Sequence, residues 1–294
     1  MRKQKYLKIS SMKIVRFLGG LGNQMFQYTL YKALQNRFPN VKADLQGYKD
    51  YPLHNGFELE HIFDLKINKV SSFTSNLYYS RKWTYRKLRR LLSLKNTYIE
   101  EKTLFSFDTS ILNNQRTAYY WGYWQNFDYF KDIANQIKND FQFKLPLSNE
   151  NQQILEQINL KNSVSLHIRR GDYLKDPFLG GLCGPEYYKQ AISYIQSNSA
   201  SLSFFIFSDD IPWCTENLHL DDCTFISWNK GSSSYIDMQL MSACKHNVIA
   251  NSSFSWWAAW LNPNPTKIVI GPKKWINDPD RNVIMSFPQN WISF

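Results

Sequence analysis

The chain has 294 residues, 43% of them hydrophobic, and this length predicts two domains with room for sizeable cores. Its apolar runs fall short of the roughly 18 residues that span a membrane, which excludes a helical integral membrane protein. The formal net charge of +11 favours polyanions, anionic membrane faces or phosphorylated ligands as partners, and charge alone does not choose among them.

The first ten residues, MRKQKYLKIS, are basic and lack the apolar core of a signal peptide. We therefore expect a cytoplasmic protein. The four cysteines show neither CxxC spacing nor histidines at metal-ligand intervals. We expect them to be free thiols in a reducing compartment.

A strand, a glycine turn and a helix are predicted in direct succession near the start. Residues 13–18 (KIVRFL) predict the strand and residues 19–22 (GGLG) the turn. The helix is predicted by an apolar stripe at Phe26, Leu30, Ala33 and Leu34. The glycines let the backbone approach a ligand and the helix N-terminus attracts anions, although such a turn also serves simple strand-to-helix geometry. Asn23 and Gln24 either cap the helix or orient a ligand.

The rest of the first half contains two segments of unusual composition. Residues 41–80 predict short strands and loops. Residues 81–95 carry seven basic residues beside Trp83 and several leucines, which indicates either a solvated helix face or a site for anionic lipid or a charged glycan. Residues 118–124 (AYYWGYW) predict an aromatic strand that belongs to the core or to a sugar-stacking wall.

From about residue 150 the chain alternates regularly between strand and helix patterns, which is typical of βαβ units on a parallel sheet. We therefore place the domain boundary near residue 150. The expected strands are 163–169, 203–208, 223–227, 247–250 and 267–270. The expected helices are 185–196, 234–244 and 254–261. The last twenty residues, rich in Pro and Asn, are expected to cross back to the first domain.

Polar residues follow three of these strands, and in a doubly wound sheet such strand ends lie on one rim. The three groups are His167, Arg169, Arg170 and Asp172; Ser208, Asp209 and Asp210; and residues 251–255 (NSSFS). Side chains two apart share a face of a strand, so His167 and Arg169 should point the same way.

These residue types predict a site for a nucleotide diphosphate without a Walker lysine. Arginine forks bind phosphate bidentately, and hydroxyl and N–H groups at a helix N-terminus bind a second phosphate oxygen. Carboxylates accept hydrogen bonds from the donors of a base edge or a ribose. The pair Asp209 and Asp210 is alternatively a divalent-metal site, but the two arginines can neutralise the phosphates themselves. Asp237, near the start of a predicted helix, is either a helix-flank acid or a base reader.

Four motifs occur in order along most of the chain. They are GGLGNQMFQY at 19–28, HIRRGDY at 167–173, FSDD at 207–210 and NSSFSWWAAWL at 251–261. Together they resemble the α-1,2-fucosyltransferases of glycosyltransferase family 11. HxRRxDY combined with SSFSWW is specific, whereas neither the glycine turn nor FSDD is specific alone. Thr29 departs from the alanine usual in the family, which puts no catalytic residue in doubt.

The resemblance implies an α/β fold of GT-B type, in which two Rossmann-like domains face a central cleft. Residues 1–150 would form the N-terminal, acceptor-side domain, and residues 151–294 the C-terminal domain that binds GDP-fucose. The implied reaction is inverting, metal-independent transfer of L-fucose from GDP-β-L-fucose to O2 of a terminal β-galactoside on an acceptor glycan. No cofactor and no nucleic acid are expected as partners. Residues 81–95 are a candidate for peripheral contact with the inner membrane face.

The resemblance also implies roles for individual residues. Arg169 would hold the β-phosphate of the donor and His167 would lie against the nucleotide. Asp237 would face guanine, and Asn23 would reach across from the first domain. The remaining donor-binding residues expected are Gly20, Gly22, Arg170, Asp209, Ser252, Ser253, Phe254 and Ser255.

The sequence does not identify the base that takes the proton of the acceptor hydroxyl. Asp172 is the nearest candidate, but it could equally pin Arg169 or Arg170. Three other functions compete with this interpretation. Transfer of another deoxyhexose, or transfer to another hydroxyl, preserves the site. A glycoside hydrolase with paired carboxylates leaves the arginines unexplained, and a polyanion-binding protein would gather its basic residues at the strand ends rather than in residues 81–95.

Overall fold

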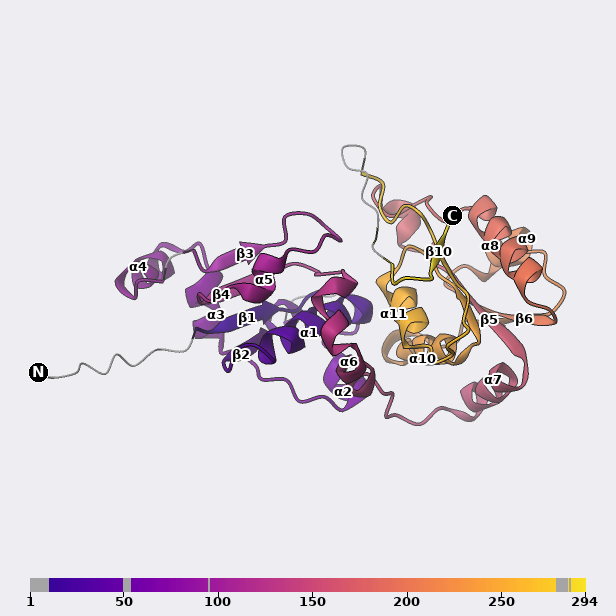
Figure 1. Cartoon of the computed structure of the whole chain (residues 1–294), viewed down its shortest axis with the longest axis horizontal. Helices are drawn as coiled ribbons and strands as arrows, with labels where there is room; N and C mark the ends of the chain where they lie inside the picture. The colour runs from indigo at the N-terminus through magenta and orange to yellow at the C-terminus, as the bar shows by residue number, and fades with distance from the viewer. Residues whose placement is uncertain (1–10, 50–53, 95, 279–284, 286) are drawn as a thin grey trace, which may run out of the picture.

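The structure is a computed structural model that describes residues 11–49, 54–94, 96–278, 285 and 287–294. The strands of these residues form two sheets, one of four strands and one of six, and every strand pair is parallel. Figure 1 shows the two sheets side by side along the long axis of the molecule. The α/β class predicted from the sequence is confirmed.

The first sheet has the strand order β2-β1-β4-β3. Its strands are β1 (Lys13–Arg16), β2 (Val41–Asp44), β3 (Tyr98–Glu100) and β4 (Ala118–Trp121). The helices of this half are α1 (Leu21–Gln35), α2 (Leu59–Phe63), α3 (Ser72–Tyr79), α4 (Trp83–Leu91), α5 (Thr109–Asn113) and α6 (Ala134–Asp140). Short 3₁₀ turns occupy Gln46–Tyr48, Phe127–Tyr129 and Lys131–Ile133.

The predicted opening unit of strand, glycine turn and helix is present as β1 and α1. The predicted apolar stripe of the helix is buried, with Phe26, Leu30 and Leu34 all inaccessible to solvent. Residues 41–80 hold α2 and α3 as well as β2, so the expectation of strands and loops there was wrong in part. Helices of five and eight residues depend on tertiary packing for their stability, which a local pattern does not report.

The second sheet has the strand order β10-β9-β8-β5-β6-β7. Its strands are β5 (Asn162–Ile168), β6 (Leu202–Ser208), β7 (Cys223–Ile226), β8 (His246–Val248), β9 (Val269–Gly271) and β10 (Ile292–Ser293). The helices are α7 (Asn149–Leu160), α8 (Pro185–Asn198), α9 (Ile211–Asn217), α10 (Tyr235–Ala243) and α11 (Ser253–Leu261), with 3₁₀ turns at Tyr173–Lys175 and Gly231–Ser233. The predicted strands and helices are all present, whereas α7, α9 and β10 were not predicted.

Each sheet reverses its strand order at one point, and these two points position the site. In the second sheet the chain leaves β5 toward β6 on one side and later returns to β8 on the other. In the first sheet β1 lies between β2 and β4 in the same way. Parallel sheets bind ligands outside the carboxyl ends of the strands at such reversals. The loops after β1 and β4 and those after β5 and β8 are therefore the expected binding loops.

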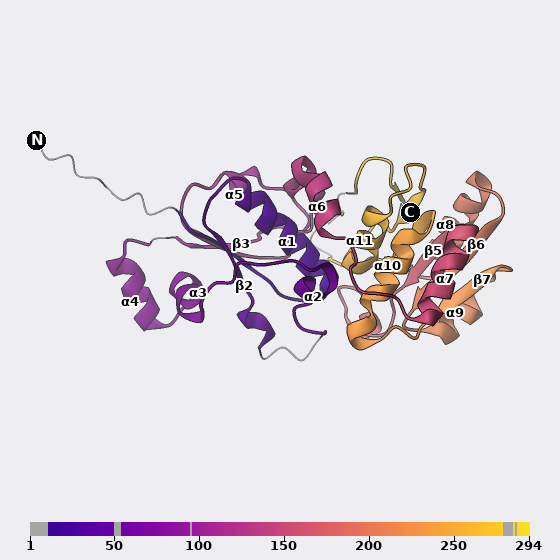
Figure 2. The same cartoon turned by 90° about the horizontal axis from the view of Figure 1, so that it is seen from below.

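Helices α1 and α11 join the two halves, and both lie between the sheets when the molecule is seen from the side and from below (Figures 1 and 2). The ring of Phe26 packs 4.7 Å from Trp256 and 4.8 Å from Trp257, measured between centroids. The indole N–H of Trp257 donates to the carbonyl of Gly22 at 3.0 Å. This apolar joint holds the glycine turn of the first half against the start of α11.

The division near residue 150 remains a proposal. In its support, the strands of the first sheet precede residue 122 and those of the second follow residue 161. Ser148 caps α7 by accepting from the N–H of Asn151 at 3.3 Å. In the tail, β10 pairs with β9 of the second sheet, while Trp275 packs at 6.4 Å on Phe105 of the first half.

Two further expectations concern the chain as a whole. The four cysteines are free thiols, as predicted. Among the described residues no helix has both the length and the apolar character that a membrane span requires. The basic residues 1–10 and Lys95 lie outside the described part of the chain.

Candidate active site

A cleft of about 780 Å³ lies between the two halves, at the carboxyl ends of both sheets. From the first half it is lined by the glycine turn, residues 19–23, together with His54, Asn55, Glu58 and Tyr123. From the second half it is lined by the loops after β5, β6, β7 and β8. Both reversals of strand order therefore face the same space, and most of the predicted site residues surround it.

Arg169 follows β5 directly and supplies the cleft with its central cation. One guanidinium nitrogen lies 2.8 Å from a carboxylate oxygen of Asp172, and another lies 3.2 Å from Asp209, which follows β6. The guanidinium also lies 5.6 Å from the ring centroid of Tyr173. The side chain remains 35% exposed, so a ligand in the cleft can reach it. Asp172 is thus a partner of Arg169 rather than of Arg170.

Arg170, the neighbouring residue, points away from the cleft. Its Nε donates to Asp210 at 2.9 Å, and its guanidinium lies 4.3 Å over the ring of Trp213. Its backbone N–H donates to Asp209 at 2.9 Å. Successive side chains leave an extended chain on opposite sides, so Arg169 and Arg170 are separated by local geometry. The structure does not bring Arg170 to the lining of the cleft.

His167 lies inside the sheet with its ring at the floor of the cleft, 6.0 Å from the ring of Phe254. Burial, reinforced by the positive charge of Arg169, lowers the pKa of His167 to about 3. The imidazole is therefore neutral throughout the physiological range. Its Nδ1 is buried and makes no hydrogen bond within the described chain. A neutral imidazole can offer a hydrogen bond to a ligand without adding charge.

The loop after β8 brings a helix N-terminus to the cleft. Ser252, Ser253 and Phe254 line the cavity where α11 begins. Ser255 is fully buried, donates to the carbonyl of Ser252 at 3.3 Å and does not line the cavity. Asn251 anchors the loop by donating to the carbonyls of Leu179 and Trp275. The first turn of α11, whose N–H groups have no acceptor within the helix, therefore lines the same cavity as Arg169.

Asn23 links the two halves across the cleft. Its side-chain oxygen accepts from Gln125 at 2.6 Å and from the hydroxyl of Ser253 at 3.1 Å. Gly22 beside it lies so close to α11 that a Cβ would stand 2.6 Å from the carbonyl carbon of Ser253. Only glycine permits this approach. Gly20 also lines the cleft, where a Cβ would meet the ring of His54 at 3.2 Å.

Gln24 has a role other than the two expected from the sequence, which were to cap the helix or to orient a ligand. Its amide donates to the carbonyls of Gly19 and Gly56 and accepts from the N–H of Glu58. The side chain therefore neither caps α1 nor faces a ligand. It holds the loop that carries His54 and Glu58 against the glycine turn.

Asp237 lies at the far end of the cleft on the first turn of α10. It accepts from the amide of Asn229 at 2.7 Å, and Asn229 in turn pairs with the buried Asn151. Burial raises the pKa of Asp237 to about 7, and the hydrogen bond from Asn229 opposes this rise. A carboxylate held in this way accepts strongly from any N–H donor that enters the cleft.

Sequence reasoning missed several residues that line the cleft. They are His54, Asn55, Glu58, Tyr123, Tyr173, Asn229, Lys230 and Ser234. Tyr173 belongs to the HIRRGDY motif and could have been found there. Tyr123 is the last residue but one of the AYYWGYW segment, whose Ala118, Tyr119 and Tyr120 belong to the core. His54, Asn55, Asn229 and Lys230 stand on loops with no local signal, whereas Glu58 and Ser234 precede helices directly.

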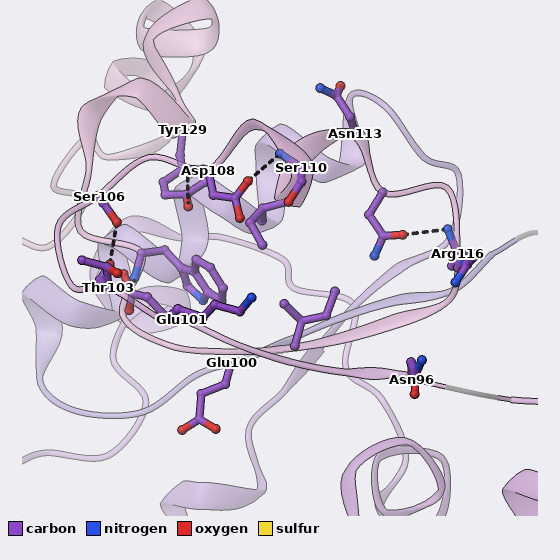
Figure 3. Close-up of a pocket in the computed structure, with 15 residues that line it drawn as sticks. Asn96, Glu100, Glu101, Thr103, Ser106, Asp108, Ser110, Asn113, Arg116 and Tyr129 are labelled. Carbon is purple, nitrogen blue, oxygen red and sulfur yellow. Dashed lines mark hydrogen bonds between the residues drawn. The ribbon is translucent and has the colours of Figure 1, made fainter.

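A second cavity of about 730 Å³ lies in the first half beside β3 and α5 (Figure 3). It contains none of the residues predicted to bind the donor. Its polar lining is largely paired with itself, as in the hydrogen bonds from Ser110 to Asp108 and from Ser106 to Thr103 that Figure 3 shows. Glu101 accepts the N–H groups of Tyr123 and Trp124 and so supports the wall of the main cleft.

The two carboxylates that follow β6 are each paired with an arginine. Asp209 and Asp210, considered above as an alternative metal pair, lie against Arg169 and Arg170 respectively. In the part of the chain that the structure describes, no group of three or more His, Cys, Asp or Glu side chains has an arrangement that could hold a metal ion. The chemistry available in the cleft is therefore anion binding by Arg169 and the start of α11, with carboxylates at its edges.

The sequence model of glycosyl transferase family 11 matches residues 1–294. The chain belongs to this family. An α-1,2-colitosyltransferase of Escherichia coli is 34% identical, over 96% of this chain and 98% of its own length. An O-antigen biosynthesis glycosyltransferase, WbnK, also of Escherichia coli, is 32% identical over 94% and 98%. A human galactoside α-(1,2)-fucosyltransferase is 28% identical over 45% of this chain and 40% of its own length.

Solved structures of other glycosyltransferases resemble the fold of this family 11 chain, and a fucosyltransferase is among them. The crystal structure of NodZ from Bradyrhizobium superposes with a TM-score of 0.52 and covers 86% of this chain and 94% of that one. At 13% sequence identity this likeness concerns the fold alone. The predicted GT-B arrangement of two parallel α/β sheets about a cleft is confirmed.

Proposed function

We propose that this family 11 protein transfers L-fucose from GDP-β-L-fucose to O2 of a terminal β-galactoside, with inversion and without a metal. The observation that carries the proposal is the placement of Arg169 and the N-terminus of α11 at one reversal of strand order, opposite Gly22 and Asn23. This arrangement suits a diphosphate, because a fixed guanidinium and unpaired helix N–H groups both bind phosphate oxygens.

The donor would lie along the second half of the cleft. The diphosphate would bind between Arg169 and residues 252–254, and His167 would contact it from the floor. Asp237 would accept from the N–H groups of guanine. The neutral state of His167 supports this pose, since the imidazole adds no charge that competes with Arg169 for the phosphates.

The transferred sugar would stand where the two halves meet. As the bond between its anomeric carbon and the diphosphate oxygen breaks, negative charge grows on GDP. The galactose O2 forms a new bond to the anomeric carbon on the opposite face and gives up its proton to a general base or to solvent. Arg169 binds the leaving diphosphate more strongly as this charge develops, so it stabilises the transition state more than the ground state. Loss of one such preorganised donor raises the barrier by about 3–4 kcal/mol.

Asp172 would have one of two roles in this reaction. Its pairing with Arg169 at 2.8 Å supports a role as a brace for the guanidinium. Its carboxylate is 58% exposed at the mouth of the cleft, which also leaves it able to turn toward an acceptor hydroxyl and take the proton. We favour the brace, because the ion pair is the contact that the side chain makes.

A second donor is favoured by one observation. The relative that is 34% identical along nearly the whole chain is named as an α-1,2-colitosyltransferase, so a different deoxyhexose nucleotide is the competing substrate. The same phosphate and guanine contacts would serve it. Only the sugar would differ.

The test is a transfer assay with the purified protein, a panel of β-galactosides and other glycans as acceptors, and GDP-fucose or GDP-colitose as donor. We expect α-1,2-linked product from GDP-fucose with a terminal β-galactoside, and equal rates with and without a chelator. Product from GDP-colitose but not from GDP-fucose would identify GDP-colitose as the donor in place of GDP-fucose. Loss of activity on chelation would return Asp209 to the role of a metal ligand, and release of free fucose without an acceptor would indicate a hydrolase.

A further inference from the structure

Helices α3 and α4 and the three residues after α4, residues 72–94, form a tip that takes no part in the cleft. We call it the basic tip. In both views α4 lies at the end of the long axis remote from the second sheet (Figures 1 and 2). No residue of α4 is buried. Four large apolar side chains of the tip face solvent, with Trp83 and Leu91 each 73% exposed, Phe73 59% and Leu92 53%.

The exposed side chains stand on a fixed support. Tyr85 and Leu88 of α4 pack against the small core that contains Leu77 and Tyr78 of α3. Arg89 donates to the carbonyl of Leu77 at 2.8 Å and to that of Ser80 at 2.7 Å, which clamps α4 onto the end of α3. The apolar groups are therefore held outward by a folded element, and more than half of each side chain faces solvent although Phe73 also packs 6.1 Å from the ring of Tyr85.

The charge of the protein is concentrated on the same element. The tip contains six lysine and arginine residues and no aspartate or glutamate, so its 23 residues carry +6 of the net +11. None of the ion pairs in the described residues involves a cation of α4. The tip thus offers uncompensated positive charge around exposed aromatic and leucine side chains.

We propose that the basic tip docks the protein on the surface of an anionic lipid bilayer. The lysines and arginines would lie at the headgroup phosphates, and Trp83, Leu91 and Phe73 would enter the boundary between headgroups and acyl chains. A soluble polyanion such as a nucleic acid would satisfy the cations but leave the leucines in water. The combination of both features on one helix therefore favours lipid.

Docking through the tip leaves the cleft accessible. The tip contributes no residue to the cleft, so an enzyme bound in this way would work beside the membrane with its donor and acceptor sites open. Membrane contact and transfer activity are thus separable properties of this chain, and the inference does not depend on the identity of the donor.

The experiment is flotation of the full-length protein with vesicles of phosphatidylcholine alone and with vesicles that also contain phosphatidylglycerol. We expect binding to the anionic vesicles only, decreasing as salt is raised. The triple variant Arg86→Glu, Lys87→Glu, Arg90→Glu should bind at least tenfold more weakly. The double variant Trp83→Ser, Leu91→Ser keeps every charge and should also lose binding at least tenfold.

A matched control reverses the same number of charges in the other half, through Lys189→Glu, Lys273→Glu and Lys274→Glu, which are all exposed. This variant should float with anionic vesicles as the wild type does, and all variants should keep transfer activity toward a water-soluble acceptor. The proposal is overturned if the wild-type protein does not float with anionic vesicles, or if the Trp83 and Leu91 variant floats normally. Equal loss of binding in the control variant would show that net charge explains the effect, and this result would also overturn the proposal.

Discussion

The two halves of the cleft are built by the same arrangement of strand and loop but present different chemical groups. In each half a central parallel strand, β1 or β5, ends at a reversal of strand order and its loop enters the cleft. After β1 the loop presents glycines and the amide of Asn23. After β5 it presents Arg169, which pairs with Asp172 of the same loop and with Asp209 of the loop after β6. One half supplies close backbone approach and the other supplies charge, which places the binding of an anionic donor in the second half.

The largest effect should come from removing the charge of that half. We expect Arg169→Ala to lower kcat by about 10²- to 10³-fold, because it removes a preorganised donor to the leaving diphosphate. Arg170→Ala removes the same charge one residue away but outside the cleft, and should lower kcat less than about tenfold. Steady-state rates with circular dichroism of both variants would check this. Equal losses in the two variants would contradict the separation of their roles.

The next effect concerns the end of the cleft where guanine is proposed to bind. Asp237→Asn should weaken GDP binding by about 10- to 100-fold at pH 8, since a hydrogen bond to a charged acceptor contributes about 1.5–3 kcal/mol. The pKa of Asp237 is raised to about 7, so its carboxylate forms as the pH rises through that value. Wild-type affinity for GDP should therefore increase between pH 6 and pH 8, with release of a proton on binding.

The control for this pH dependence is the variant itself. Calorimetry of Asp237→Asn should give an affinity that is flat over the same range. A wild-type affinity that falls with rising pH would show that the carboxylate does not accept from the base.

A smaller effect should follow from forcing the two halves apart. A methyl group at Gly22 would lie 2.6 Å from the backbone of Ser253, so Gly22→Ala should raise the KM for the donor by about tenfold and lower the free energy of unfolding by about 1–3 kcal/mol. Gly184→Ala is the matched control, because a Cβ there meets nothing within 4 Å. Donor KM values and thermal melts would distinguish them, and normal kinetics in the Gly22 variant would mean that the approach of the halves is not needed.

The smallest effect is expected at the edge of the charged loop. Asp172→Asn keeps an oxygen that can accept from Arg169, and an exposed ion pair contributes at most about 1 kcal/mol. We expect kcat to fall less than about fivefold with an unchanged pH–rate profile. A loss above 100-fold, together with disappearance of the acidic limb of the profile, would identify Asp172 as the base instead of the brace.

The second half was far more predictable than the first. Its central strands β5 and β6 are buried on both faces, and the predicted helices α8, α10 and α11 have nine or more residues, so their patterns are long and unambiguous. The short helices α2, α3 and α9 have too few residues to show a reliable helical periodicity of apolar side chains. The site shows the same contrast, since Arg169 and Ser253 belong to motifs, whereas His54 and Glu58 stand on a loop that Gln24 holds in place through long-range hydrogen bonds.

The sequence by itself determined what depends on neighbouring residues. Alternation along an extended chain is local, so it separates Arg169 from Arg170 before any fold is known. Contacts between distant segments were decided only by the tertiary structure. Asp209 becomes a partner of Arg169 because β6 pairs with β5, and Gly22 meets Ser253 because α1 packs on α11. The charged residues of the cleft can thus be predicted from local sequence patterns, whereas the contact between the two halves depends on how the two sheets are brought together.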